Sequence, residues 1–233
     1  MNEDRTGQLA LRFPSERRCT LDSFEPGPNA ELLAELARCG RAGDFTSMWL
    51  VGESASGKSH LLQAACHAAA EGGRATAYLP ARLKAGGVGV LDGLGEFAVV
   101  AVDDLEQWVG ERQWEEALMG LYQQLLNNRA TLLIASTFGP LDVTVGLADL
   151  RSRLRAAQVF AIRTLDDVDR AHAIERLAAQ RGLELGTDVV GFILRRAPRR
   201  MDELIAAFDR LDRGALAQQR RLTIPLAKDV LGL

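Results

Sequence analysis

Residues 48–59, MWLVGESASGKS, decide the fold of this chain. The first four residues are a continuous apolar run, which is typical of a strand buried on both faces of a sheet. The remaining eight match the pattern G-x-x-x-x-G-K-[ST], and a helical pattern continues from Gly57 to about Ala70. A buried strand, a glycine-rich loop and a helix in this order predict a loop that binds phosphate groups.

Each fixed position of this phosphate loop (residues 52–59) has a chemical reason. Gly52 and Gly57 let the backbone curl so that successive N–H groups point at phosphate oxygens. Lys58, one of only three lysines in the chain, supplies a point charge for the β- and γ-phosphates. Ser59 offers a hydroxyl to Mg²⁺, and the following helix turns its positive end towards the anion. The alternative is a glycine-rich turn with a purely structural role.

Further apolar runs alternate with helical patterns on both sides of this loop. The other runs expected to form strands are residues 75–79, 97–102, 131–135 and 159–162. Helices are expected at residues 30–38, where Asn29 can act as the N-cap, at 57–70 and at 113–127. This alternation predicts an α/β fold with a mostly parallel five-stranded sheet flanked by helices.

The pattern changes after Thr164. Four amphipathic helices are expected at residues 166–181, 188–196, 201–211 and 224–231, the last with Thr223 and Pro225 as start signals. Because no apolar strand-like run lies between them, these residues predict a small all-helical subdomain. We therefore divide the chain into a polar tail (residues 1–14), a nucleotide-binding domain (15–164) and a helical lid (165–233).

The composition narrows the class of protein. The chain has 233 residues with 28 basic against 31 acidic side chains, which argues against nucleic-acid binding through bulk positive charge. Its three cysteines have no CxxC spacing, which favours a reducing compartment over a disulfide framework or a zinc site. The sequence shows neither an apolar signal-peptide core nor a run approaching the roughly 20 residues of a membrane span. We expect a cytoplasmic protein without a membrane partner.

An acidic motif completes the expected site. The apolar run at residues 97–102 ends in Asp103 and Asp104. A carboxylate at the end of a buried strand can hold Mg²⁺ directly or through a water, so Asp103 is the metal candidate together with Ser59. For Asp104, one interpretation is the N-cap of the residues that follow.

Five segments in order resemble the AAA+ ATPases of the bacterial replication-initiator group, the DnaA/Hda group. They are GESASGKSH (52–60), VVAVDD (99–104), LLIAST (132–137), DLRSRL (149–154) and the helical lid. The resemblance covers nearly the whole chain and implies a P-loop AAA+ core, a lid, and bound ADP or ATP with Mg²⁺. It implies that Asp104 orients the attacking water; aspartate is one methylene shorter than the glutamate of many relatives, which favours weak or no ATPase activity. The residues assigned to the nucleotide are Gly52, Glu53, Ser54, Ala55, Ser56, Gly57, Lys58, Ser59, His60 and Ser136.

The resemblance assigns two further segments. Arg153 falls where these proteins carry an arginine finger, which places a fixed charge on the transition-state phosphate of a neighbouring protein. The alternative is an ordinary surface arginine. The N-terminal QLALRF resembles a peptide that docks onto the β sliding clamp of DNA polymerase III, with Gln8 as polar latch and Leu9, Leu11 and Phe13 as anchors. The same alternation also fits a half-buried strand.

One position departs from the family pattern. DnaA-like proteins have an arginine at the start of a lid helix that points at the phosphates, and Asp202 stands in that place here. An aspartate would repel phosphate, so either Arg199 or Arg200 replaces the arginine or the contact is absent. Ser136 and Thr137 follow the fourth strand, where a polar side chain would sense the γ-phosphate.

The resemblance implies a negative regulator of chromosomal replication initiation. Bound to nucleotide and docked on the DNA-loaded clamp, it would stimulate ATP hydrolysis by DnaA through Arg153 and so prevent re-initiation. Its partners would be DnaA, the clamp, and DNA indirectly through the clamp at the nucleoid; a homo-oligomer is also compatible. The alternative is a helicase loader or another initiator-like AAA+ assembly ATPase acting on DNA.

Overall fold

The structure is a computed structural model that describes residues 19–41, 43–196, 200–218 and 221–232. Its main element is one sheet of five strands in the order β2-β3-β4-β1-β5. The strands are β1 (Thr46–Val51), β2 (Thr76–Leu79), β3 (Val99–Val102), β4 (Thr131–Ser136) and β5 (Gln158–Ala161). All five predicted strands are present, and the sheet, expected to be mostly parallel, is parallel throughout.

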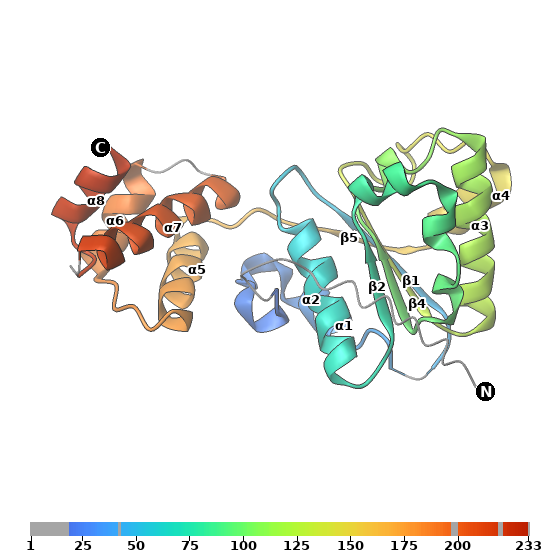
Figure 1. Ribbon diagram of the computed structural model, residues 1–233, viewed down its shortest axis with the longest axis horizontal. Helices are drawn as coiled ribbons and strands as arrows, with labels where there is room; N and C mark the ends of the chain where they lie inside the picture. Colours follow the sequence, from blue (N-terminus) through green and yellow to red (C-terminus); the bar gives the residue numbers. More distant parts are fainter. Residues whose placement is uncertain (1–18, 42, 197–199, 219–220, 233) are drawn as a thin grey trace, which may run out of the picture.

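Helices cover both faces of the sheet, as Figure 1 shows. One face carries α1 (Ala30–Leu36) and α2 (Lys58–Glu71), and the other carries α3 (Arg112–Asn127) and α4 (Ala148–Arg155). Successive side chains of a strand point to opposite faces, so Trp49 and Leu50 of β1 enter different cores. Both are fully buried, which confirms the prediction that the run at residues 48–51 forms a strand buried on both faces of the sheet.

The C-terminal helices form a separate group beside the sheet (Figure 1). They are α5 (Asp167–Gln180), α6 (Thr187–Arg196), α7 (Met201–Gln218) and α8 (Ile224–Leu231). Ile174, Phe208 and Leu211 are fully buried in a core that these helices build among themselves. A polar contact joins this lid to the N-terminal segment, because Arg176 lies 3.0 Å from the Glu25 carboxylate and donates to the Asp22 carbonyl at 3.2 Å.

Short 3-10 helices fill several connections between these elements. They are η1 (Leu21–Ser23), η2 (Gly27–Asn29), η3 (Ala81–Gly86), η4 (Val88–Leu91), η5 (Leu94–Glu96) and η6 (Leu105–Gln107). The longest series, η3 to η5, leads from β2 to β3 and packs on α3 through η4 and η5. Among the described residues, no helix has both the length and the apolar character needed to cross a membrane.

Three local features differ from the sequence-based expectations. Helix α7 continues beyond residue 211 to Gln218. Gly214 in this extension lets α8 pack closely, because a Cβ there would lie 2.6 Å from Val230 Cγ2. Helix α4 is absent from the predicted elements. Asn29 precedes α1 but makes no capping bond, since its side chain pairs with the backbone N–H and carbonyl of Arg163, 134 residues away. Thr223, by contrast, caps α8 as predicted, its hydroxyl accepting from the Leu226 N–H.

Candidate nucleotide-binding site

Parallel strands bring the predicted site residues to one edge of the sheet. The phosphate loop follows β1, Asp103 and Asp104 follow β3, and Ser136 is the last residue of β4. These three strands are neighbours, with β4 between β3 and β1. The Gly52 N–H donates to the Ser136 carbonyl at 3.3 Å, which joins the loop to the end of β4. The carboxyl edge of a parallel sheet is where such folds bind ligands.

The shape of the loop requires glycine at both fixed positions. Gly57 has φ of +96°, and a Cβ there would lie 2.7 Å from Cε2 of Phe24. A Cβ at Gly52 would lie 2.6 Å from Ser56 Oγ. Ala55 also has a positive φ, +63°, so the loop carries a left-handed residue that the motif did not predict.

The cation of the loop is held inside it. Lys58 is only 6% exposed, and its Nζ donates to the carbonyls of Gly52 at 2.7 Å and Glu53 at 2.9 Å. Ser56 Oγ is buried and has no hydrogen-bond partner among the described residues. A buried ammonium and an unpaired hydroxyl in a glycine-rich loop at a helix N-terminus fit the phosphates of a nucleotide.

The acidic strand end is the most tightly organised part of the site. Asp103 is 2% exposed, and its two oxygens accept from the Tyr78 hydroxyl at 2.6 Å and from the Asp104 N–H at 3.1 Å. The Trp108 indole donates to the Asp103 carbonyl at 2.9 Å. Burial and Asp103 raise the pKa of Tyr78, and Ser59 acts in the opposite direction and lowers it, so this tyrosine interacts with both metal candidates. This donor set, a hydroxyl and a carboxylate, fits Mg²⁺.

Tyr78 is a site residue that the sequence reasoning missed. It lies on β2, which pairs with β3 in parallel register, and this places it beside the end of the acidic strand. Burial, followed by the hydrogen bond to Asp103, raises the pKa of Tyr78 above its ordinary value. The hydroxyl therefore stays protonated and remains a donor to the carboxylate. The signal available in the sequence was the hydroxyl-bearing ring of Tyr78 in an otherwise mostly apolar strand.

Asp104 and Glu106 extend the acidic side of the site. Asp104 has left-handed backbone angles and its side chain makes no capping bond, so the N-cap interpretation is wrong. Burial first, then the charges of Asp103 and Glu106, raise the pKa of Asp104, while Lys58 opposes this shift. Glu106, also missed from sequence, accepts from the Thr137 N–H at 3.0 Å and so holds the segment after β4. Burial would raise the pKa of Glu106, but the hydrogen bond from Thr137 and further hydrogen bonds outweigh burial and lower the pKa.

His60 connects the helix after the loop to the N-terminal segment. Its Nε2 lies 3.1 Å from both the Ser23 hydroxyl and the Thr20 carbonyl, and the Phe24 ring packs 5.7 Å from the imidazole. Burial lowers the pKa of His60, with the Thr20 carbonyl acting in the opposite direction. The role of His60 in nucleotide binding stays a prediction, because the ring is engaged with residues 20–24.

Three arginines on α4 differ in their engagement. Arg151 donates to the Val145 carbonyl at 2.8 Å, and Arg155 donates to the Pro140 carbonyl at 3.4 Å. Arg153 is exposed and has no hydrogen-bond or ion-pair partner within the described part of the chain. Of the three, the candidate finger is thus the one whose guanidinium is free to contact another molecule.

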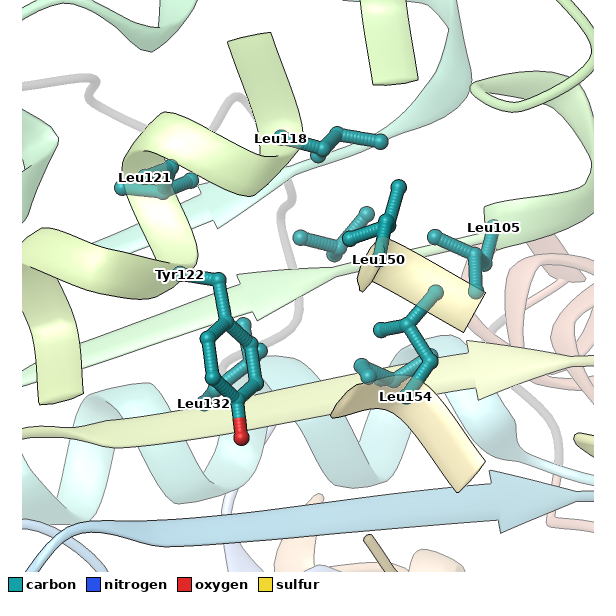
Figure 2. Close-up of a pocket in the computed structure, with 9 residues that line it drawn as sticks. Leu105, Leu118, Leu121, Tyr122, Leu132, Leu150 and Leu154 are labelled. Atoms are coloured by element: carbon teal, nitrogen blue, oxygen red, sulfur yellow. The ribbon is translucent and has the colours of Figure 1, made fainter. Parts of the chain in front are cut away.

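A small apolar cavity lies beneath α4. Figure 2 shows Leu150 and Leu154 of α4 pointing into it, opposite Leu118 and Leu121 of α3. Its volume is about 10 Å³ and its lining is leucine, valine, isoleucine and the Tyr122 ring. A cavity of this size and polarity is no ligand site, and Leu150 and Leu154 remain buried in the core around it.

The lid and the tail complete the comparison with the predicted site. Asp202, which replaces the expected arginine, pairs with Arg200: Nη2 lies 2.9 Å from Oδ2 and Nε lies 3.2 Å from Oδ1. Hydrogen bonding to Arg200 lowers the pKa of Asp202. Arg200 is therefore engaged within the lid, and Arg199 lies outside the described residues. The residues predicted to bind the clamp, Gln8, Leu9, Leu11 and Phe13, also lie outside them.

Comparisons with known proteins agree with this geometry. Residues 167–231 match the family model described as Hda, lid domain. The fold is similar to domain III of the replication initiation protein DnaA from Thermotoga maritima (17% identity, TM-score 0.78, covering 94% of this chain and 98% of that one). It is also similar to AMPPCP-bound DnaA from Aquifex aeolicus (20% identity, TM-score 0.69, covering 84% of this chain and 65% of that one). A third similar structure is the Holliday junction branch migration motor RuvB from Thermotoga maritima (15% identity, TM-score 0.65, covering 87% of this chain and 68% of that one).

The comparisons establish the fold and the type of lid. The α/β domain with its helical lid is the AAA+ fold, and the AMPPCP in a similar structure agrees with nucleotide binding at the phosphate loop. Two of the similar structures are described as a DNA replication initiation protein or factor. The match of residues 167–231 to the Hda lid and the DnaA-like fold of the whole are thus consistent with Hda, a DnaA-related AAA+ protein.

Proposed function

We propose that this protein is a negative regulator of chromosomal replication initiation that stimulates ATP hydrolysis by DnaA. In this proposal it binds ADP or ATP with Mg²⁺, docks on the DNA-loaded β sliding clamp, and presents Arg153 to the ATP held by DnaA. Conversion of DnaA to its ADP form would then prevent re-initiation. The Hda lid match and the DnaA-like fold support this choice over unrelated nucleotide-binding functions.

The exposure of Arg153 is the observation that carries the proposal. An arginine finger must reach the phosphate of another subunit with a rigid, delocalised charge, so its guanidinium cannot be committed within its own chain. Arg153 meets this requirement, whereas Arg151 and Arg155 on the same helix are bonded to backbone carbonyls. Arg153 also lies in the last turn of an α-helix, which gives its backbone a fixed direction.

The chain's own hydrolysis is proposed to be weak or absent. Asp104 is one methylene shorter than the glutamate that would reach an attacking water, and Asp202 with its partner Arg200 occupies the place of the lid arginine. The nucleotide would then keep the protein in the form that binds its partner, while chemistry takes place on DnaA.

Docking on the clamp is proposed from the tail sequence. An extended peptide can drop Leu9, Leu11 and Phe13 into a preformed apolar groove while Gln8 fixes the register. The clamp encircles DNA, so contact with DNA would be indirect, and the protein would act in the cytoplasm at the replisome. A homo-oligomer is also compatible with this proposal.

A reconstituted hydrolysis assay tests the proposal. Purified DnaA with labelled ATP is mixed with clamp-loaded DNA and with wild-type protein, Arg153→Ala or Arg155→Ala, and release of phosphate is followed. The removal of a trans-acting finger is expected to lower stimulation by about 10³-fold or more. Arg155→Ala is the matched control and should keep most of the stimulation. Wild-type protein without effect, or full stimulation by Arg153→Ala, contradicts the proposal.

A binding assay separates the docking step from the alternative class. Deletion of residues 1–13 should abolish binding to immobilised clamp and the stimulation of DnaA, while nucleotide binding persists. Retention of the replicative helicase in place of the clamp would favour a helicase loader or another initiator-like assembly ATPase.

A further inference from the structure

Glu115 is a buried carboxylate outside the nucleotide site. It lies in the first turn of α3 and is 2% exposed, whereas its neighbour Glu116 is 53% exposed and pairs with Arg112. Burial of a charge is costly unless hydrogen bonds satisfy it, so a fully buried glutamate requires a structural reason. The reason is found in the backbone groups around it.

Three N–H groups converge on this carboxylate. Oε1 accepts from Gly110 at 3.0 Å and from Gly146 at 2.9 Å, and Oε2 accepts from Leu147 at 2.6 Å. Burial would raise the pKa of Glu115, but the three backbone hydrogen bonds and the nearby charge of Arg151 outweigh this and lower it. The side chain is therefore ionised, and it ties the start of α3 to the segment that leads into α4.

That segment has no cap of its own. Leu147 occupies the N-cap position of α4 and cannot accept a hydrogen bond through its side chain. Glu115 instead accepts from the N–H groups of Gly146 and of the N-cap residue Leu147, and its negative charge also suits the positive end of α4. Gly146 permits the close approach, because a Cβ there would lie 3.2 Å from Glu115 Oε2.

Packing beneath α4 acts together with this polar attachment, since Leu150 and Leu154 are buried against α3. The helix has only eight residues, and an isolated helix of that length is unstable, so its position depends on tertiary contacts. Its apolar contacts, Leu150 and Leu154, border the small cavity of Figure 2. Arg151 adds a second polar tie through the carbonyl of Val145, which lies two residues before Leu147.

We propose that Glu115 is a positioning residue for the arginine finger: by holding residues 146 and 147 it fixes the direction in which α4 presents Arg153. This inference rests on the proposed function of Arg153. Arg153 lies six residues beyond Leu147, which is about 9 Å along a helix. A tilt of about 10° at the start would move the Arg153 backbone by about 1.6 Å, and a displacement of about 1 Å can cost up to about a hundredfold in rate.

Glu115→Gln is the central variant, with Glu116→Gln as the matched control. The amide keeps the shape of the side chain, but it replaces one acceptor by a donor that faces a backbone N–H. Hydrogen–deuterium exchange should become about tenfold or more faster at residues 145–155 in Glu115→Gln and stay unchanged in Glu116→Gln. Maximal stimulation of DnaA should fall by about ten- to a hundredfold, with the half-saturating DnaA concentration unchanged.

Nucleotide binding by the protein itself separates positioning from misfolding. Affinity for a fluorescent ADP analogue should be unchanged in Glu115→Gln, since the phosphate loop does not contact this glutamate. Gly146→Ala is the second variant; its added methyl group presses on the carboxylate and should produce the same pattern with a smaller amplitude.

The outcomes distinguish this inference from the proposed function. Normal exchange in α4 together with full stimulation by Glu115→Gln would overturn the inference while leaving the role of Arg153 intact. Full stimulation by Arg153→Ala would overturn the proposed function, and the exchange data alone would then decide whether Glu115 holds α4. A loss of stimulation that follows a general loss of folded protein would also count against positioning.

Discussion

Replacement of Gly57 by alanine is expected to weaken nucleotide binding, and the structure gives two separate reasons. At φ of +96° an L-residue is strained, at a cost of about 1–2 kcal/mol. The added Cβ would also lie 2.7 Å from Cε2 of Phe24, well inside contact distance, so the ring has to move. Phe24 packs against His60, and its displacement disturbs the segment at residues 20–24 that covers the helix after the loop.

The size of the effect depends on which state of the protein bears the strain. A loop that relaxes away from the strained angle in free protein must return to it when phosphates bind, so the cost appears as lost affinity. At about 1.4 kcal/mol per tenfold change, 1–2 kcal/mol corresponds to a dissociation constant raised by about five- to thirtyfold. Displacement of Phe24 is expected to appear chiefly as a lower free energy of unfolding.

The assay combines a fluorescent ADP titration with urea unfolding of the same variant. Gly120→Ala is the control, because Gly120 lies within α3 and nothing stands within 4 Å of an added Cβ. It should leave affinity unchanged and stabilise the protein by about 0.5–1 kcal/mol, since alanine is the better helix former. Wild-type affinity together with wild-type stability in Gly57→Ala would refute the reasoning.

Three further predictions concern the surroundings of the site and the lid. Tyr78→Phe removes a donor to the buried Asp103 carboxylate and should lower the free energy of unfolding by about 1.5–3 kcal/mol in urea titrations. Tyr122→Phe is the control and should change this free energy little, because the Tyr122 hydroxyl makes no hydrogen bond within the described residues. Arg181→Ala removes two ion pairs within the lid, at 2.6 and 2.7 Å, and should destabilise it by about 1–3 kcal/mol, seen as faster hydrogen exchange at residues 167–231 with the sheet unaffected. Because the pKa of His60 is lowered in the fold, the unfolded chain binds the proton more readily than the folded one. The contribution of His60 to the free energy of unfolding should therefore be fully present above pH 6.5 and decrease as the pH falls below it. His60→Gln should remove this pH dependence from urea titrations.

The phosphate loop and the sheet were predictable because their signals are local. A buried strand reads as a continuous apolar run, and a loop that must curl around phosphate needs its glycines and lysine at fixed spacing. Residues 48–59 carry both signals within twelve positions, so no knowledge of distant contacts was needed.

Other features depend on contacts between residues that are far apart in the sequence. Asn29 has the side chain of an N-cap, but the backbone of Arg163, 134 residues away, takes its hydrogen bonds. Tyr78 and Asp103 are 25 residues apart, and Glu115 and Gly146 are 31 apart. Each pair meets only because of the strand order or of helix packing, so its role is visible in three dimensions alone.

Helix α4 was not predicted for a different reason. Its eight residues, Ala148–Arg155 (ADLRSRLR), contain three arginines and only two buried leucines. Two apolar positions are too few to show the helical repeat in the sequence. The helix forms because α3 provides an apolar surface for it and a carboxylate that accepts from the Leu147 N–H just before its first residue.

The position of the Lys58 ammonium has a consequence for which anions the protein retains. Its charge is already shared between two loop carbonyls, so a single phosphate group exchanges one set of hydrogen bonds for another and gains little. A diphosphate can engage the ammonium and several backbone N–H groups at the same time, and its gain grows with every group that it adds. Selectivity at this loop is therefore expected to follow the number of linked phosphates more than total anionic charge, so that orthophosphate leaves readily while a nucleoside diphosphate stays.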